Sequence, residues 1–172
     1  MAREFVRLLT SIHDDPDWLG MTSQQHDIYI ALMTSPDLSW CGVMPYIPKR
    51  LAEFAKDLTE RKVIAALAEL ESMRMVVIDR SFDELLIRTY VRHDGLLKKP
   101  NIARAMEKAL VRVHSGTIRA AVIVELGKVY ADDPNMPCWD ALSPELMIDV
   151  AAAGERCGAN YSPNYSPNYS RI

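Results

Sequence analysis

Residues 50–91 read RLAEFAKDLTERKVIAALAELESMRMVVIDRSFDELLIRTYV, and this stretch decides the fold. Pro48 suits the first turn of a helix over residues 49–56, whose apolar stripe is Leu51, Phe54 and Ala55. Residues 57–59 then form a turn, and Thr59 can cap a longer helix. The inward face of that helix follows helical spacing at Val63, Ala66, Leu67, Leu70 and Met73. Helix, short turn and longer helix are the sequence form of a helix-turn-helix.

A β-hairpin is predicted directly after the longer helix. Residues 75–79 (MVVID) and 85–91 (LLIRTYV) are β-branched and apolar, and a polar segment connects them. Upstream, Thr22 or Ser23 can cap a helix, and residues 43–47 predict a brief strand. These elements follow the order of a winged helix-turn-helix: helix, short strand, helix, helix, strand, strand. We therefore expect a mainly α fold with a small β-hairpin, in which residues 22–95 form a winged helix-turn-helix domain followed by C-terminal helices.

The rest of the chain divides into an arm and three segments. Residues 1–21 form an N-terminal arm, and residues 96–131 predict a helical extension that either completes the core or forms a dimer interface. Residues 132–158 contain a short helical segment that starts at Ser143-Pro144. Residues 159–172 repeat Asn-Tyr-Ser-Pro, a composition that cannot pack a core. We expect this tail to be disordered, either without a specific function or as a peptide that attracts a partner.

Composition indicates a soluble, cytoplasmic protein. At 172 residues and 49% hydrophobic, the chain can bury a core of ordinary size. It contains neither the apolar run of a membrane-spanning helix nor that of a signal peptide. Its three cysteines, Cys41, Cys138 and Cys157, are far apart and odd in number, which argues against disulfides and zinc. We expect reduced thiols and no membrane partner.

The net charge of −3 hides a segregation of charge along the chain. Residues 1–48 carry −4, residues 49–128 carry +5, with sixteen Lys and Arg against eleven Asp and Glu, and residues 129–172 carry −4. The basic block coincides with the predicted winged domain and the helices that follow it. Such clustering is expected of a phosphate-binding surface, although a solvated helix face is the commoner cause of a single charge run.

Three stretches carry a family resemblance: HDIYIALMTSPDLSWCGVMPY (26–46), RLAEFAKDLTERKVIAALAELESMRMVVIDR (50–80) and ELLIRTYVRHDGLLKKPNIARAMEKAL (84–110). They resemble winged-helix proteins of actinobacterial phages and prophages, of the replication-initiator or replisome-organiser type, over about residues 5–115. The matching positions are Tyr29, Leu32, Gly42, Val43, Arg92, Asp94, Gly95, Pro100 and Asn101. The resemblance implies a winged fold and a DNA context in the bacterial host cytoplasm, without a defined activity.

The longer helix is the predicted reading helix. In helix-turn-helix complexes the residues near its start reach base edges, and arginine can bind guanine through two hydrogen bonds. Arg61 is therefore the first candidate for a base contact, with Thr59 beside it and Lys62 on phosphate. Ala65 and Ala68 supply no hydrogen bonds, and Glu69 would repel phosphate. The alternative is that Arg61 and Lys62 are merely solvated.

The wing and its exit supply the second set of candidate contacts. Arg80 begins the connector, and Arg88 and Arg92 alternate along or just beyond the second strand. Lys98 and Lys99 follow, and phosphate contacts from this group would position the protein without reading sequence. Asp79, Asp83 and Glu84 at the tip argue against deep insertion of the wing, and ordinary surface charge is an equal alternative for the basic group.

No sequence pattern indicates catalysis, a cofactor or a metal site. The four histidines are scattered, there is no phosphate-cradling glycine loop, and no nucleophile stands in a recognisable setting. We therefore expect a non-enzymatic protein with no cofactor. Two functions remain. One is a binder of double-stranded DNA, expected to be a homodimer, in replication initiation or transcriptional regulation. The other is a protein-interaction module that docks a replisome or host protein.

Overall fold

A computed structural model describes residues 6, 8, 10–93 and 96–158 of the chain. Over these residues the protein is mainly α, with eight α-helices and one small antiparallel sheet. This confirms that the fold is mainly α with a small β-structure, as the sequence predicts. The elements, in chain order, are α1 (Pro16–Leu19), α2 (Ser23–Thr34), β1 (Val43–Pro45), α3 (Pro48–Leu51), α4 (Glu60–Ser72), β2 (Val76–Asp79), β3 (Glu84–Ile87), α5 (Tyr90–His93), α6 (Pro100–Val111), α7 (Gly116–Asp132) and α8 (Pro144–Gly158). Short 3-10 helices occupy Thr10–Asp14, Ala52–Phe54, Leu96–Lys98 and Trp139–Ala141.

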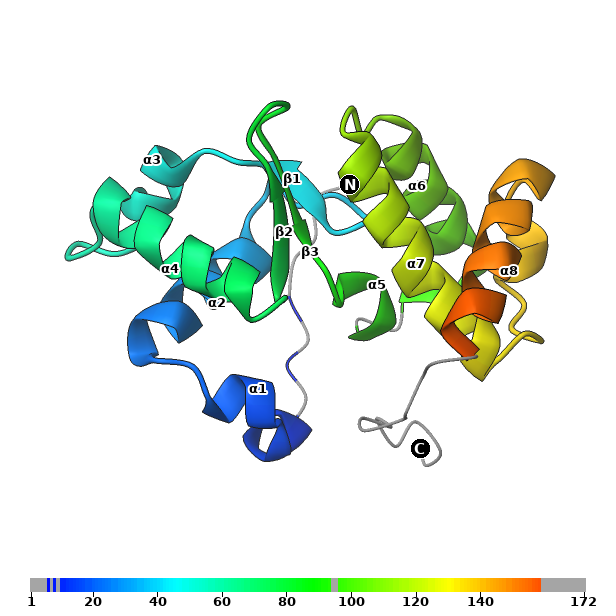
Figure 1. Cartoon of the computed structure of the whole chain (residues 1–172), viewed down its shortest axis with the longest axis horizontal. Helices are drawn as coiled ribbons and strands as arrows, with labels where there is room; N and C mark the ends of the chain where they lie inside the picture. Colours follow the sequence, from blue (N-terminus) through cyan, green and yellow to red (C-terminus); the bar gives the residue numbers. More distant parts are fainter. Residues whose placement is uncertain (1–5, 7, 9, 94–95, 159–172) are drawn as a thin grey trace.

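The sheet stands between two groups of helices (Figure 1). On one side lie α1 to α4, and on the other lie α6 to α8, with α5 below the strands. The strand order is β1-β3-β2, so β3 is central, and the register pairs Val43 with Leu86 and Val76 with Ile87. Leu85, Leu86 and Ile87 are all buried in the hydrophobic core, and α7 packs against this central strand.

Helix α2 begins where its sequence predicts. The Thr22 side chain accepts a hydrogen bond from the Gln25 backbone N–H, and the Gln25 side chain accepts one from the Thr22 N–H at 2.6 Å, which together form a capping box. Ile28 and Leu32 on this helix are fully buried. The cap at Thr22 therefore fixes the start of α2, and the buried side chains fix the face that it turns to the core.

Two sequence predictions need correction. The second strand of the hairpin does not run to Val91: β3 ends at Ile87, and Tyr90–His93 form the helical turn α5. An extended chain would place residues 88 and 92 about 13 Å apart, whereas a helical turn brings them to about 6 Å along its axis. Arg88 and Arg92 can thus reach the same partner. The helix predicted over residues 49–56 is also shorter, since Pro48–Leu51 is followed by the 3-10 turn Ala52–Phe54.

Gly42 allows β1 to lie against α5. Its φ is +81°, a left-handed conformation that favours glycine. A Cβ at this position would lie 2.8 Å from the Cβ of Tyr90, which is itself buried. The glycine is therefore required both by its backbone conformation and by the close approach of Tyr90.

The C-terminal helices share one hydrophobic core with the sheet. Met106 of α6 and Ile118, Val122 and Leu126 of α7 are buried in the same cluster as the β3 side chains. Helices α7 and α8 approach closely at Gly127, where an added Cβ would lie 2.7 Å from the Cβ of Ala153. The predicted tail, residues 159–172, lies outside the described residues. None of the helices in the described part of the chain combines the length and the apolar character needed to cross a membrane.

Candidate nucleic-acid interface

Helix α4 presents its first turn on the surface. Thr59 caps it, since the Thr59 hydroxyl accepts a hydrogen bond from the Lys62 N–H at 3.3 Å. Val63, Ala66, Leu67 and Leu70 are buried against the core, as the helical spacing predicts. Glu60, Arg61 and Lys62 are consequently exposed at the start of the helix.

The exposed face of α4 carries one unpartnered arginine and an apolar strip. Within the described residues Arg61 makes no hydrogen bond or ion pair, whereas Lys62 Nζ donates to the Asp57 carbonyl oxygen at 2.9 Å. Ile64 is 43% exposed and lies beside Ala65 and Ala68 on this face. Ile64 was not among the residues predicted for this face. Its helical spacing could have identified it, because residues four positions apart, such as Ile64 and Ala68, lie on the same side of a helix. This face can offer one charged hydrogen-bond donor and apolar contacts.

Two glutamines of α2 hold α4 in place. Gln25, which is buried, donates to the Glu69 carboxylate at 2.6 Å, and Gln24 Nε2 donates to the Lys62 carbonyl oxygen at 3.0 Å. The carboxylate of Glu69 is thereby directed at α2. Glu69, which the sequence predicts to repel phosphate, therefore has a partner within the fold.

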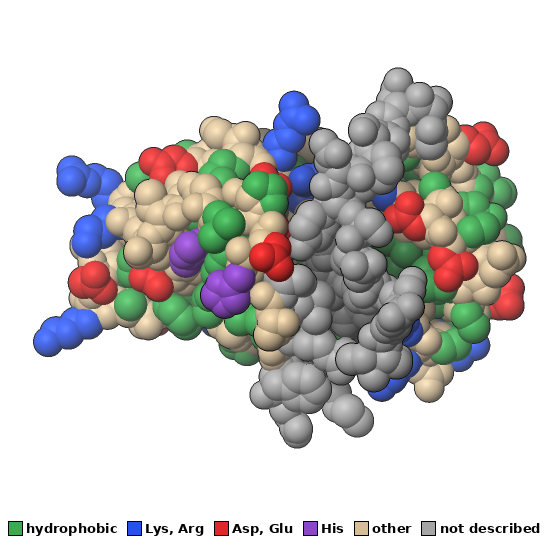
Figure 2. Space-filling model, turned by 90° about the horizontal axis from the view of Figure 1, so that it is seen from below, with side chains coloured by type: hydrophobic (Ala, Val, Ile, Leu, Met, Phe, Trp, Pro, Cys, Tyr) green, Lys and Arg blue, Asp and Glu red, His purple; other side chains and the backbone are tan. Residues whose placement is uncertain are grey.

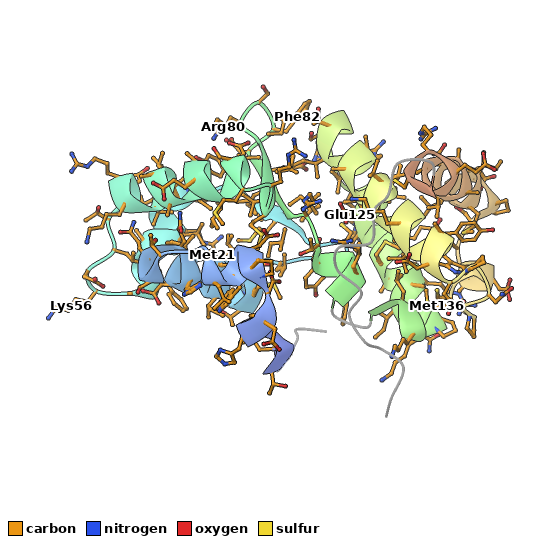
Figure 3. All side chains as sticks on the ribbon, turned by 60° about the horizontal axis from the view of Figure 1, so that its bottom comes forward. Met21, Lys56, Arg80, Phe82, Glu125 and Met136 are labelled. Atoms are coloured by element: carbon orange, nitrogen blue, oxygen red, sulfur yellow. The ribbon has the colours of Figure 1, made fainter. Side chains whose placement is uncertain are left out.

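The tip of the β2–β3 hairpin carries an arginine and a phenylalanine that project from different sides (Figure 3). Arg80 pairs with Glu71 of α4 at 2.9 Å, and its guanidinium lies 5.7 Å from the centre of the Tyr46 ring. Phe82 is 54% exposed. Because the Arg80–Glu71 pair is on the surface, it is worth at most about 1 kcal/mol, and Arg80 can exchange it for another anion.

Two of the three tip acids bond to residues at the start of α7. The Ser115 hydroxyl donates to the Asp79 carboxylate at 2.6 Å, and this bond lowers the pKa of Asp79 below its ordinary value. The backbone N–H groups of His114 and Ser115 both donate to Glu84, each at 2.9 Å. These contacts fasten the base of the hairpin to the loop between α6 and α7.

Arg88 and Arg92 point into the molecule, toward Glu125. The distance from Arg88 Nη1 to Glu125 Oε1 is 3.1 Å, and Arg92 Nε lies 2.9 Å from Glu125 Oε2 without the alignment of a hydrogen bond. Lys128 Nζ is 2.7 Å from the same carboxylate, whose side chain is only 2% exposed. Glu125 lies between the sheet and the C-terminal helices (Figure 3). This cluster was not predicted from the sequence, because Arg88 and Arg92 were assigned to one basic surface with the other cations.

The cations between Arg88 and Arg119, which belong to the basic block of residues 49–128, thus divide into a group that faces Glu125 and a group on the surface. Arg119 is exposed, but its guanidinium donates to the Val113 carbonyl oxygen. Arg104, Lys108 and Arg112 are exposed and recur every four residues along α6, so they form one basic stripe. Lys98 and Lys99 are exposed just before this helix.

The predicted contact residues therefore fall in four places. Thr59, Arg61 and Lys62 lie together at the start of α4, and Arg80 lies at the hairpin tip beside the end of the same helix. Lys and Arg side chains project from the left-hand end of the face in Figure 2, the end that carries the turn before α4 in Figure 1. The remaining four are elsewhere: Arg88 and Arg92 at Glu125, and Lys98 and Lys99 before α6.

Neither the cysteines nor any cluster of metal-ligating side chains forms a second centre in the part of the chain that the structure describes. Cys41 and Cys138 are buried, and burial raises the pKa of the Cys138 thiol to about 11. Burial raises the pKa of Cys41 as well, so both thiols are protonated at neutral pH. Over residues 10–93 and 96–158, no three His, Cys, Asp or Glu side chains gather to hold a metal ion.

Comparison with known proteins returned no match: no family model, no curated protein and no solved structure matches this chain. The resemblance to phage winged-helix proteins therefore remains a prediction from the sequence.

Proposed function

We propose that this chain is a non-enzymatic DNA-binding protein of the winged helix-turn-helix type. In this assignment α3 and α4 are the helix-turn-helix, α4 is the reading helix that enters the major groove, and the β2–β3 hairpin is the wing. The element order and the antiparallel hairpin that follows α4 directly support it.

The observation that carries the proposal is the exposed first turn of α4. Val63 and Leu67 fix the buried side of the helix, and the opposite side presents Arg61 with no partner among the described residues. An arginine in this position is free to bind the O6 and N7 atoms of guanine, and Ile64 and Ala68 can contact a thymine methyl group. A small reading surface of this kind supports modest sequence selectivity.

The phosphate contacts are fewer than the sequence predicts. Thr59 and Lys62 flank Arg61, and Arg80 can release Glu71 to bind a phosphate. Arg88 and Arg92 are left out of the proposed contacts, because moving either would leave the buried Glu125 without that cation. Lys98 and Lys99 remain candidates for flanking phosphates.

The biological role follows from the sequence resemblance. It favours replication initiation or transcriptional regulation in a phage or prophage, with a homodimer on repeated or palindromic sites. A dimer would supply the affinity that one small reading surface lacks, and the stoichiometry of protein to duplex in a titration measures this directly.

The test is a fluorescence anisotropy titration of labelled duplex fragments from the DNA around the gene. Raising the salt from about 50 to 200 mM should weaken binding steeply, because released counterions drive phosphate contacts. Arg61→Ala should weaken binding to the preferred fragment by about tenfold, as expected for the loss of one base contact. Arg156→Ala, an exposed arginine of α8, is the matched control and should change nothing.

Two results would contradict the proposal. One is the absence of duplex binding at low salt to any of these fragments. The other is equal loss of affinity in Arg61→Ala and Arg156→Ala, which would indicate attraction by overall charge alone. Circular dichroism of both variants would exclude misfolding as the cause.

A protein-docking function is the second candidate, and one surface feature favours it. A groove of about 290 Å³ between the end of α2 and α3 is lined by the exposed apolar side chains Ile47 and Phe54. Exposed aromatic side chains in a groove are typical of protein contacts. A chain that serves only in docking would show salt-insensitive partner binding, reduced by Phe54→Ala, and no affinity for duplex DNA.

A further inference from the structure

A second groove separates the β2–β3 hairpin from α6. It has a volume of about 710 Å³, and one of its walls is formed by β1, the hairpin tip and Trp40. The other wall is α6, which contributes Lys108 and Arg112. Phe82 leans toward this groove, away from Arg80 (Figure 3). Helix α6, which forms one wall of the groove, lies on the far side of the hairpin from α4 (Figure 1).

The groove combines two exposed cations with an exposed ring, Phe82, and a half-buried one, Trp40. Lys108 and Arg112 are exposed, one helical turn apart, and neither has a partner among the described residues. Phe82 is 54% exposed, and the indole N–H of Trp40 donates to no described atom. Cations spaced along a helix beside unpaired aromatic faces are the two elements of a single-strand binding surface.

Two carboxylates, Asp83 and Glu84, also line the groove. Glu84 lines it, but its carboxylate accepts hydrogen bonds from the N–H groups of His114 and Ser115. The His114 ring nitrogen Nδ1 lies 3.2 Å from Glu84 as well. Asp83 is the one lining carboxylate with no partner in the described residues, against Lys108 and Arg112. The lining therefore carries two cations and two carboxylates, with the Glu84 carboxylate directed at backbone N–H groups, and Arg104, one turn earlier on α6, adds a third cation to the same stripe.

The size and edge chemistry of the groove select its ligand. Pockets of roughly 300 to 1,000 Å³ hold drug-sized molecules, so the size of this groove suits a few unpaired nucleotides. An extended peptide cannot add to β1, because the Val43 N–H and C=O are already bonded to Ser39 and Pro45 has no N–H. Both features favour a flexible polyanion with aromatic bases.

We propose that this groove binds unpaired single-stranded DNA. The phosphates follow the basic stripe Arg104, Lys108 and Arg112 along α6, and a base stacks on Phe82 with Trp40 behind it. The site goes beyond the proposed duplex interface, because it uses the opposite side of the hairpin and none of the α4 residues. A protein with both sites could hold duplex DNA and a neighbouring unwound strand at once.

The test is an anisotropy titration of the full chain with a labelled oligothymidine, with the duplex titration run in parallel. Lys108→Ala combined with Arg112→Ala should reduce oligothymidine affinity by about tenfold or more and lower the salt slope by about 1.4, from 0.7 for each lost phosphate contact. Phe82→Ala should weaken binding by about fivefold or more, and Phe82→Trp should preserve it because stacking is retained. Arg61→Ala and Arg156→Ala are the matched controls and should leave this affinity unchanged.

The outcomes separate this inference from the duplex proposal. Loss of oligothymidine binding in the α6 variant, with duplex binding kept, supports two distinct sites. No oligothymidine binding by the unmodified chain, or equal binding by the α6 variant, would overturn the inference and leave the duplex proposal standing. Loss of both ligands in Arg61→Ala would also overturn it, since a single site would then serve both. Oligothymidine binding without duplex binding would support the groove and contradict the duplex proposal.

Discussion

Arg88 and Glu125 join the two halves of the molecule. Arg88 follows directly after the central strand β3, Glu125 lies in the middle of α7, and Arg88 Nη1 is 3.1 Å from Glu125 Oε1. Arg92 and Lys128 approach the same carboxylate, so three cations surround one acid. The cations keep some access to solvent while the acid has almost none. The cluster therefore depends on Glu125 more than on any one of its partners.

The first prediction follows from this dependence. Glu125→Gln removes the only negative charge of the cluster and leaves three cations close together, so we expect the free energy of unfolding to fall by about 3 kcal/mol. Urea denaturation measures the loss. Glu155→Gln, at an exposed position of α8, is the control and should change stability by no more than about 0.5 kcal/mol. A loss below about 1 kcal/mol for Glu125→Gln would contradict a structural role for the cluster.

Gly42 gives a second prediction. Gly42→Ala must hold a side chain at φ +81° and 2.8 Å from the Tyr90 Cβ. Left-handed strain and overpacking together should lower the free energy of unfolding by about 2 to 4 kcal/mol. Gly116→Ala is the matched control, because an added Cβ there has no heavy atom within 4 Å and the residue lies at the start of α7. If both variants were equally stable, the close approach of Tyr90 to Gly42 would be wrong.

Local patterns made the helices and the hairpin predictable. Thr22 and Thr59 cap helices where the sequence expects, because capping depends on a few adjacent residues. The apolar spacing of Val63, Leu67 and Leu70 likewise identifies the buried side of α4. Such features need no knowledge of distant partners.

The directions of charged side chains were not predictable, because distant partners decide them. Arg88 and Arg112 look alike in a basic run, yet Arg88 faces a buried acid 37 residues away and Arg112 faces a groove. Asp79 and Glu84 similarly find their partners in the loop before α7. Charge clustering along the chain therefore predicted a basic surface but placed Arg88 and Arg92 on it, where the structure turns them inward.

The contact between α7 and α8 gives a third prediction. An added methyl at Gly127 would meet the Ala153 Cβ and the Gly154 nitrogen, each at 2.7 Å. Gly127→Ala gains helix propensity worth about 1 kcal/mol, but separating the helices should cost more, for a net loss of about 1 to 2 kcal/mol. Thermal unfolding followed by circular dichroism measures it. Because Ala120 is exposed on the same helix, Ala120→Gly should lose only the propensity contribution. A more stable Gly127→Ala variant would show that the helices are further apart.

Asp79 gives a prediction about pH. The Ser115 hydroxyl and the Ser81 backbone N–H hold the pKa of Asp79 below its ordinary value of 3.8 in the folded protein. A carboxyl with a lowered folded-state pKa stabilises the fold above its unfolded pKa, and that stabilisation is lost as the pH falls through the folded value. Asp79→Asn cannot titrate, so the variant should be less stable than the unmodified chain at pH 7. This difference in the free energy of unfolding should stay the same down to about pH 4, near the pKa of an unfolded Asp. Below that pH the difference should shrink. Urea denaturation across this range, with Asp149→Asn of α8 as the exposed control, checks both the direction and the window. A stability difference that stays constant into the acid range would mean that the bond from Ser115 to Asp79 does not favour the charged carboxylate.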